Sequence, residues 1–115
     1  MAGGGPGVLH IPWYATLFRG DGFEAALAEI APIALRYRAV DYEVYRARDD
    51  TYKFLQSATF QSALDFERYW YGDEFSQWRS DYSSWYQVPV LYTWMDRVVQ
   101  GRVGPEPEAV RSPVE

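Results

Sequence analysis

The chain has 115 residues, of which 48% are hydrophobic and 23% charged, and its formal net charge is −5. This length fits one domain with its own core. An acidic chain without a basic patch argues against binding to nucleic acid or to an anionic membrane surface, because such binding needs Lys and Arg to neutralise phosphates. The sequence has no cysteine, which excludes disulfides, thiolate metal sites and cysteine nucleophiles.

Targeting signals and terminal composition set the expected boundaries. No apolar run approaches the roughly 18 residues that span a bilayer. The glycine-rich start lacks the basic and apolar regions of a signal peptide, so we expect a cytoplasmic protein. Residues 1–7 are rich in glycine, and residues 102–115 are rich in proline and glutamate with little to bury. We expect both to be disordered tails, which leaves residues 8–101 as the domain.

The domain opens with a strand pattern and then a helix pattern. Residues 8–18 are rich in apolar and aromatic side chains and predict a strand, in which Pro12 indicates an edge position or a bulge. Apolar residues at helical spacing predict a helix over residues 23–37. Pro32 is expected to kink or break this helix, because proline removes a backbone donor.

Two further strands follow as a hairpin. Residues 40–46 and residues 53–60 both alternate between apolar and polar side chains, with a turn between them. One side of the second strand carries Phe54, Gln56, Ala58 and Phe60.

A second helical region and a last strand complete the domain. Ser62 is a good N-cap for a helix, Gly72 is expected to interrupt it, and Asp73 to cap its continuation. Residues 90–99 predict the last strand, with Val90 marking the start of its apolar face. The order of strand, helix, two strands, helix and strand is the split βαβ pattern. It predicts an α+β, ferredoxin-like fold, an antiparallel sheet with helices on one face.

Residues 60–75 carry a motif that resembles a known family. Phe60, at the end of the third strand, is followed at matching positions by Ser62, Phe66, Tyr69, Gly72, Asp73 and Phe75. This arrangement, with the element order over residues 8–99, resembles the antibiotic-biosynthesis-monooxygenase-like family of dimeric α/β-barrel proteins. The resemblance implies a homodimer whose two sheets face each other, and an apolar pocket between sheet and helices. The known activities of that family include cofactor-independent oxygenation of aromatic polyketides to quinones, and haem degradation.

The resemblance transfers unevenly to single positions. Where haem-degrading members have Asn, Trp and His, this chain has Trp13, Tyr69 and Arg79, so we do not expect haem cleavage. Where quinone-forming members have Asn, Trp and Tyr, it has Gln56, Phe60 and Phe66. Gln56 keeps an amide that both donates and accepts hydrogen bonds. Arg79 lies one position from an arginine that those members use.

Each candidate also has a structural interpretation. His10, the single histidine, is either a packed residue or a general base for a phenol proton. Gln56 either bonds to backbone or holds a ligand oxygen. Arg79 either pairs with a carboxylate such as Asp73 or Asp81, or stabilises an anion inside the pocket. A metal site is not expected, because no second His or Cys exists to share it.

The aromatic residues also allow both a structural and a ligand-binding interpretation. Twelve lie between residues 60 and 94, among them four of the five tryptophans. Trp70, Phe75 and Trp78 fit either core or a ligand wall. Trp85, Tyr86, Tyr92 and Trp94 fit either a dimer interface or a pocket.

We therefore predict a cofactor-independent monooxygenase for a flat aromatic or polyketide-like substrate, which binds in the apolar pocket between sheet and helices. His10 and Arg79 are the catalytic candidates. The substrate-binding candidates are Trp13, Gln56, Phe60, Phe66, Tyr69 and Trp70. We expect a homodimer with an apolar aromatic small molecule as ligand, and no cofactor, metal, nucleic acid or membrane. The alternatives are a non-catalytic binding protein and a structural dimer.

Overall fold

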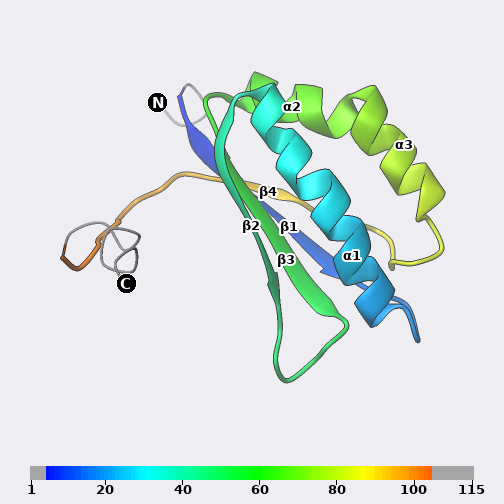
Figure 1. The fold of residues 1–115 in the computed structure, drawn as a ribbon. Helices are drawn as coiled ribbons and strands as arrows, with labels where there is room; N and C mark the ends of the chain where they lie inside the picture. The colour runs from blue at the N-terminus through cyan, green and yellow to red at the C-terminus, as the bar shows by residue number, and fades with distance from the viewer. Residues whose placement is uncertain (1–4, 105–115) are drawn as a thin grey trace, which may run out of the picture.

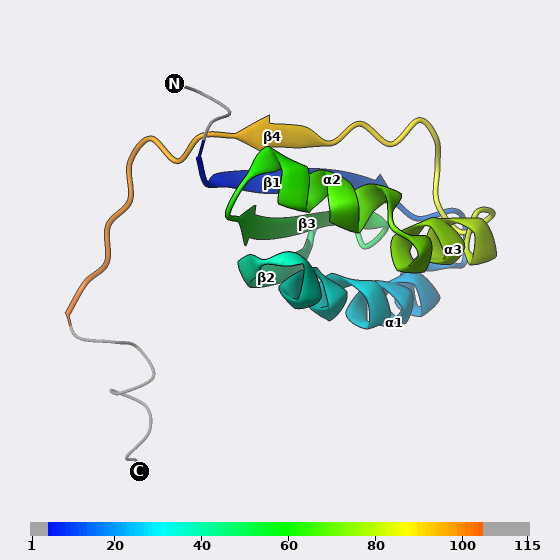
Figure 2. The same ribbon diagram turned by 90° about the horizontal axis from the view of Figure 1, so that it is seen from above.

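A computed structural model describes residues 5–104. A four-stranded antiparallel sheet in the order β2-β3-β1-β4 carries its helices on one face, as Figures 1 and 2 show. The predicted α+β, ferredoxin-like fold is confirmed. Within residues 5–104, no helix is long and apolar enough to cross a membrane. Most of both predicted tails, residues 1–4 and 105–115, lies outside the described residues, and their disorder stays a prediction.

The elements follow the predicted order. The strands are β1 (Gly7–Tyr14), β2 (Ala39–Arg46), β3 (Lys53–Phe60) and β4 (Thr93–Met95). The helices are α1 (Gly20–Ile30), α2 (Ala63–Tyr71) and α3 (Asp73–Asp81), with a 3-10 helix, η1 (Ala31–Tyr37), between α1 and β2.

Strand alternation places the core between the sheet and the helices. Leu9, Ile11 and Trp13 of β1 are buried toward the helices, while the residues between them lie on the opposite, open face. On β3 the helix side carries Phe54, Gln56, Ala58 and Phe60, all buried, as the alternation predicted. The core is therefore one layer of mainly aromatic side chains.

The last strand is much shorter than predicted, and Pro12 supplies the reason. The backbone groups of even-numbered β1 residues point toward β4 and the chain before it: the Tyr14 carbonyl oxygen accepts from Gln87 N at 2.8 Å. The backbone of Pro12, also an even-numbered residue, points the same way but has no N–H group to donate. Pairing between β1 and β4 accordingly ends at His10 and Thr93. Although β1 is a central strand of the sheet, only β3 pairs with it at Pro12, so the proline occupies a local edge position, as predicted.

The first strand also ends earlier than predicted. It stops at Tyr14, and Ala15 makes only an isolated bridge to Tyr86. The chain then turns through Phe18, whose φ of 68° is in the left-handed region, which a strand does not contain.

Both predicted helix interruptions are present. At Pro32 the first helical region tightens from α1 into η1. At Gly72 the second region divides into α2 and α3. The N-cap of α3 is Gly72 itself and makes no side-chain bond, so the prediction that Asp73 caps this helix is wrong; Asp73 is its first residue.

Ser62 caps α2 as predicted. Its Oγ accepts from the backbone N of Asp65 at 3.2 Å and donates to the Asp65 carboxylate at 3.1 Å. Asp65 is buried and also accepts from Arg38 Nε at 3.0 Å. The start of α2 is therefore tied to the end of η1.

Replacing the cap tests this anchoring. Ser62→Ala removes the acceptor for a helix N–H group, and we expect it to lower the free energy of unfolding by about 1 kcal/mol. Urea denaturation followed by circular dichroism measures the change. The matched control is Ser83→Ala, on an exposed turn outside the helices, which we expect to change stability by less than about 0.5 kcal/mol.

Candidate functional site

Three predicted binding residues form one buried chain of hydrogen bonds. Trp13 Nε1 donates to Gln56 Oε1 at 3.0 Å, and Gln56 Nε2 donates to the Tyr69 hydroxyl at 3.0 Å. The Tyr69 hydroxyl donates to the backbone carbonyl of Ile30 at 2.6 Å. All three side chains are no more than 2% exposed. Their polar atoms are bonded to one another, as buried polar groups generally are.

The burial of Tyr69 within this chain of hydrogen bonds limits the chemistry that its hydroxyl group can perform. Burial raises the pKa of the Tyr69 phenol far above its ordinary value, because the phenolate would lose its hydration. The hydrogen bond from Gln56 opposes this shift and does not cancel it. Tyr69 therefore stays neutral across the physiological pH range and acts as a hydrogen-bonding group, not as a proton acceptor.

The other predicted binding residues are packing residues beside this chain. Phe60 lies 6.0 Å from Phe66 between ring centroids, and Phe66 lies 6.3 Å from Trp70. Tyr92 makes an edge contact with Phe66 at 4.8 Å, and Trp94 stacks on it at 5.9 Å. Tyr92 and Trp94 thus lie on the helix side of the sheet, where they contact α2, and not on its open face.

Arg79 is in an unusual environment for a cation. Its guanidinium carbon lies 4.0 Å from the ring centroid of Trp70 and 5.0 Å from that of Phe75, close enough for cation–π attraction. Its Nη1 atom is buried without a hydrogen-bond partner. Five ion pairs join residues of the described range, and Arg79 takes part in none of them, so the predicted pair with Asp73 or Asp81 does not form there.

Burial also affects the charge of Arg79. Desolvation lowers the pKa of the guanidinium from its ordinary value, while nearby tyrosines, first Tyr86 and then Tyr71, oppose the shift. An arginine nevertheless stays protonated in proteins. A half-buried cation with an unbonded NH2 group and aromatic walls is suited to bind an anionic oxygen.

His10 lies on the other side of the sheet. It alternates with Leu9 and Ile11, which face the helices, and its neighbours across the strands are Ser57 and Thr93. It lines a cavity of about 660 Å³ on the open face. The structure therefore does not bring His10 together with Gln56, Tyr69 or Arg79, and the helix side has no histidine available as a haem ligand, since the sequence holds only one.

The described cavities lie away from the predicted pocket. Among five of the surface cavities in residues 5–104, the one that touches a predicted binding residue has a volume of about 290 Å³ and is lined by Trp13 together with Pro12, Val88 and Leu91. Gln56, Phe60, Phe66, Tyr69, Trp70 and Arg79 line none of the five. Buried side chains of the core cluster pack between the sheet and α2.

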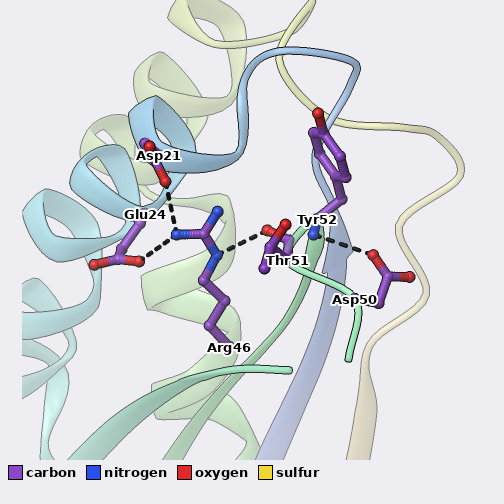
Figure 3. A network of polar contacts seen from close by, with 6 residues as sticks. All are labelled: Asp21, Glu24, Arg46, Asp50, Thr51 and Tyr52. Atoms are coloured by element: carbon purple, nitrogen blue, oxygen red, sulfur yellow. Dashed lines mark hydrogen bonds and ion pairs between the residues drawn. The ribbon is translucent and has the colours of Figure 1, made fainter. Parts of the chain in front are cut away.

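Arg46 forms a second polar centre that the sequence did not reveal. Figure 3 shows its guanidinium between the start of α1 and the β2–β3 hairpin. Nη1 bonds to Asp21 at 2.9 Å and to Glu24 at 2.8 Å, and Nε donates to the Thr51 carbonyl at 2.7 Å. Because its donors are already bonded to these groups, we interpret Arg46 as a structural residue that links α1 to the β2–β3 hairpin.

Comparison with known proteins gives the fold but no family assignment. No family model matches the chain, and no curated protein matches it. Among solved structures it is similar to a candidate antibiotic biosynthesis monooxygenase from Nitrosomonas europaea, with TM-score 0.73 and 13% identity over 81% of this chain and 90% of that one. It is also similar to SnoaB, a cofactor-independent oxygenase from Streptomyces nogalater, with TM-score 0.72 and 14% identity over 83% and 95% of the two chains.

A candidate monooxygenase of the same kind from Bordetella bronchiseptica gives TM-score 0.72 at 15% identity, over 83% of this chain and 99% of that one. At such identities the likeness concerns architecture. The chain therefore has the fold of antibiotic-biosynthesis-monooxygenase-like proteins, in agreement with the resemblance seen in residues 60–75.

Gln56 can be tested as a structural group. Gln56→Leu leaves the buried Trp13 N–H without an acceptor, and we expect a loss of about 1–3 kcal/mol in the free energy of unfolding. Chemical denaturation measures it. Gln61→Leu, at an exposed position next to the same strand, is the control and is expected to change stability by about 0.5 kcal/mol or less. Equal stabilities of the two variants would contradict the buried chain.

The raised pKa of Tyr69 gives a pH prediction. Its contribution to stability is complete below the unfolded-state pKa of about 10 and is lost as pH rises above it, because the unfolded phenol ionises first. We expect stability to fall less steeply above pH 10 in Tyr69→Phe than in the parent chain. Tyr42→Phe, at an exposed position on β2, is the control and should keep the parent slope. Denaturation midpoints measured from pH 8 to 11 compare the slopes.

Proposed function

We propose that the protein binds a flat aromatic molecule bearing an acidic oxygen and acts on it as a cofactor-independent monooxygenase. The observation that carries the proposal is the buried, unbonded Nη1 of Arg79 above the rings of Trp70 and Phe75. Similarity in fold to SnoaB, a cofactor-independent oxygenase, supports the type of reaction.

The proposed reaction uses the substrate as the reductant. Arg79 holds a phenolate or enolate oxygen, so the substrate stays ionised and electron-rich, and its proton passes to solvent. The anion transfers one electron to dioxygen, and the two radicals combine into a peroxide at a ring carbon. Loss of water then leaves a quinone: one oxygen atom stays in the product and the other leaves with the two hydrogens that the substrate lost. The protein orients the ring and stabilises the anion.

Gln56 and Tyr69 have a different part in this proposal than the sequence suggested. They hold Trp13 and the layer behind Arg79 in place, because their polar groups are bonded within the core. His10 has no part in the step, since it lies on the opposite face.

We also propose that the protein is a homodimer that associates through the open face of its sheet. The helices cover one face, and the other is bare of helices within residues 5–104 (Figure 1). The dimeric arrangement implied by the sequence resemblance uses the same face.

A second candidate, a non-catalytic binding or structural protein, is favoured by one observation. The predicted ligand residues fill the space between sheet and α2 and line none of the five cavities except through Trp13. In that case the aromatic layer is core alone.

Oxygen uptake tests the proposed reaction. The pure protein is incubated in an oxygen electrode with a panel of fused-ring phenols whose ring carbon opposite the hydroxyl carries hydrogen, and we expect uptake above the buffer blank for at least one. Arg79→Gln is expected to lower the rate at least tenfold, because the anion loses its cation, whereas Arg79→Lys keeps part of it. Arg68→Gln, at an exposed position on α2, is the control and should keep the parent rate.

The outcomes separate the candidates. Quenching of tryptophan fluorescence by a compound that gives no uptake would indicate binding without chemistry. If no compound of the panel causes quenching or oxygen uptake, the result would favour the structural role. Equal rates for the parent and Arg79→Gln would remove Arg79 from the mechanism.

A further inference from the structure

A cavity of about 290 Å³ lies between β1 and the segment that leads into β4 along the edge of the sheet (Figure 2). Pro12, Trp13 and Tyr14 line it from β1, residues of the segment 87–91 line it from the other side, and Lys53 borders it from β3. Its volume is at the lower end of the range for small-molecule pockets, about 300–1,000 Å³, so it suits a ligand of one or two rings. Arg79 does not line it, and the cavity is therefore separate from the site proposed above.

The outer wall of the cavity consists of apolar side chains that the protein leaves exposed. Val88 is 74% exposed and Leu91 is 69% exposed, and Pro89 lies beside them in the lining. In the same part of the chain, Val90 and Tyr92 pack against the core, which holds the wall in place. Because the cavity lies between two chain segments that are not helical, it is suited to a flat apolar body, which would lose its hydration there.

The charge of the cavity is positive in a chain that is acidic overall. Lys53 is the one charged residue in the lining, and it is the single lysine of the sequence. It takes part in none of the five ion pairs that join residues of the described range. Its charge acts on Asp50 from beyond ion-pair distance, and the Asp50 oxygens already accept from the Tyr14 hydroxyl at 2.6 Å and from Tyr52 N at 3.1 Å.

A neighbouring cavity of about 280 Å³ shares Pro12 and Lys53 with the first one and has no acidic lining residue either. The net charge of the chain is −5, so a region without carboxylates around an unpaired ammonium group is an exception on its surface. Such a region attracts anions.

We propose that the cavity beside Trp13 binds a small aromatic carboxylate. The ring lies against Val88 and Leu91, and the carboxylate lies beside the ammonium group of Lys53. The site is additional to the one proposed at Arg79 and does not depend on it, because the two share no charged residue. No reaction takes place there.

The single lysine gives a local measure of binding. The pure protein is treated with a limiting amount of N-acetoxysuccinimide, and mass spectrometry compares acetylation of Lys53 with that of the chain's α-amino group. We expect saturating naphthalene-2-carboxylate to slow acetylation of Lys53 at least threefold relative to the α-amino group. No protection by this probe overturns the site.

A neutral probe of the same shape tests the role of the charge. Naphthalene-2-carboxamide should need an at least threefold higher concentration for half-protection, because it makes no ion pair with the exposed lysine. Equal half-protecting concentrations of the two probes would overturn the assignment of Lys53 as the group that binds the carboxylate.

Two leucine variants locate the probe. Leu91→Asp places a carboxylate in the apolar wall, and we expect the half-protecting concentration to rise at least tenfold. Leu64→Asp, at an exposed leucine on α2, is the matched control and should keep the parent value. Equal protection in Leu91→Asp and in the parent chain overturns the cavity as the site. Protection that is lost in Arg79→Gln and kept in Leu91→Asp would place the probe at Arg79, and would thus overturn this site without affecting the proposed function.

Sedimentation of the same samples checks that the loss of labelling reports the cavity. We expect the probe to leave the association state of the chain unchanged. Protection that appears only together with a change in association state would assign it to contact between copies, and would overturn the site.

Discussion

The buried chain of hydrogen bonds from Trp13 through Gln56 and Tyr69 to the Ile30 carbonyl is the constraint on which the rest of the molecule depends. It joins β1, β3, α2 and the end of α1. Because an unpaired polar group in this layer is unfavourable, each bond fixes the position of the next element. The aromatic side chains then pack around a framework whose spacing is already set, with Trp13 in contact with Phe23 at 5.6 Å and with Tyr86 at 5.0 Å.

The same chain decides where recognition of a ligand is possible. An amide and a phenol that bond to each other have little capacity left for a guest molecule. What remains is the charge of Arg79, held against Trp70 and Phe75 without an anionic partner in the described part of the protein. The site that we propose therefore depends on the charge of Arg79 at the border of an apolar layer, and less on an empty pocket.

Local patterns predicted most of the fold, and long-range geometry explains the errors. Strand β3 has the predicted bounds because its alternation is regular, and Ser62 caps α2 because that interaction spans three residues. The length of β4 depends on which side of β1 Pro12 faces, and no pattern within residues 90–99 contains that information. His10 alternates with Leu9 and Ile11, so its separation from Gln56 was readable from the sequence once the core face was assigned. The bonding of Gln56 to Trp13 joins residues 43 positions apart and required the structure.

Pro12 has a consequence beyond the length of a strand. Pairing on this side of β1 stops at His10 and resumes at Tyr14 with Gln87. The missing N–H of Pro12 therefore lies in a short unpaired stretch, here called the bubble, that is bounded by paired residues at both ends. The small cavity beside Val88 and Leu91 occupies this bubble, and Trp13 forms its inner wall. One imino acid therefore leaves Trp13, the first member of the buried hydrogen-bond chain, beside a surface cavity, although the strands on both sides of it remain paired.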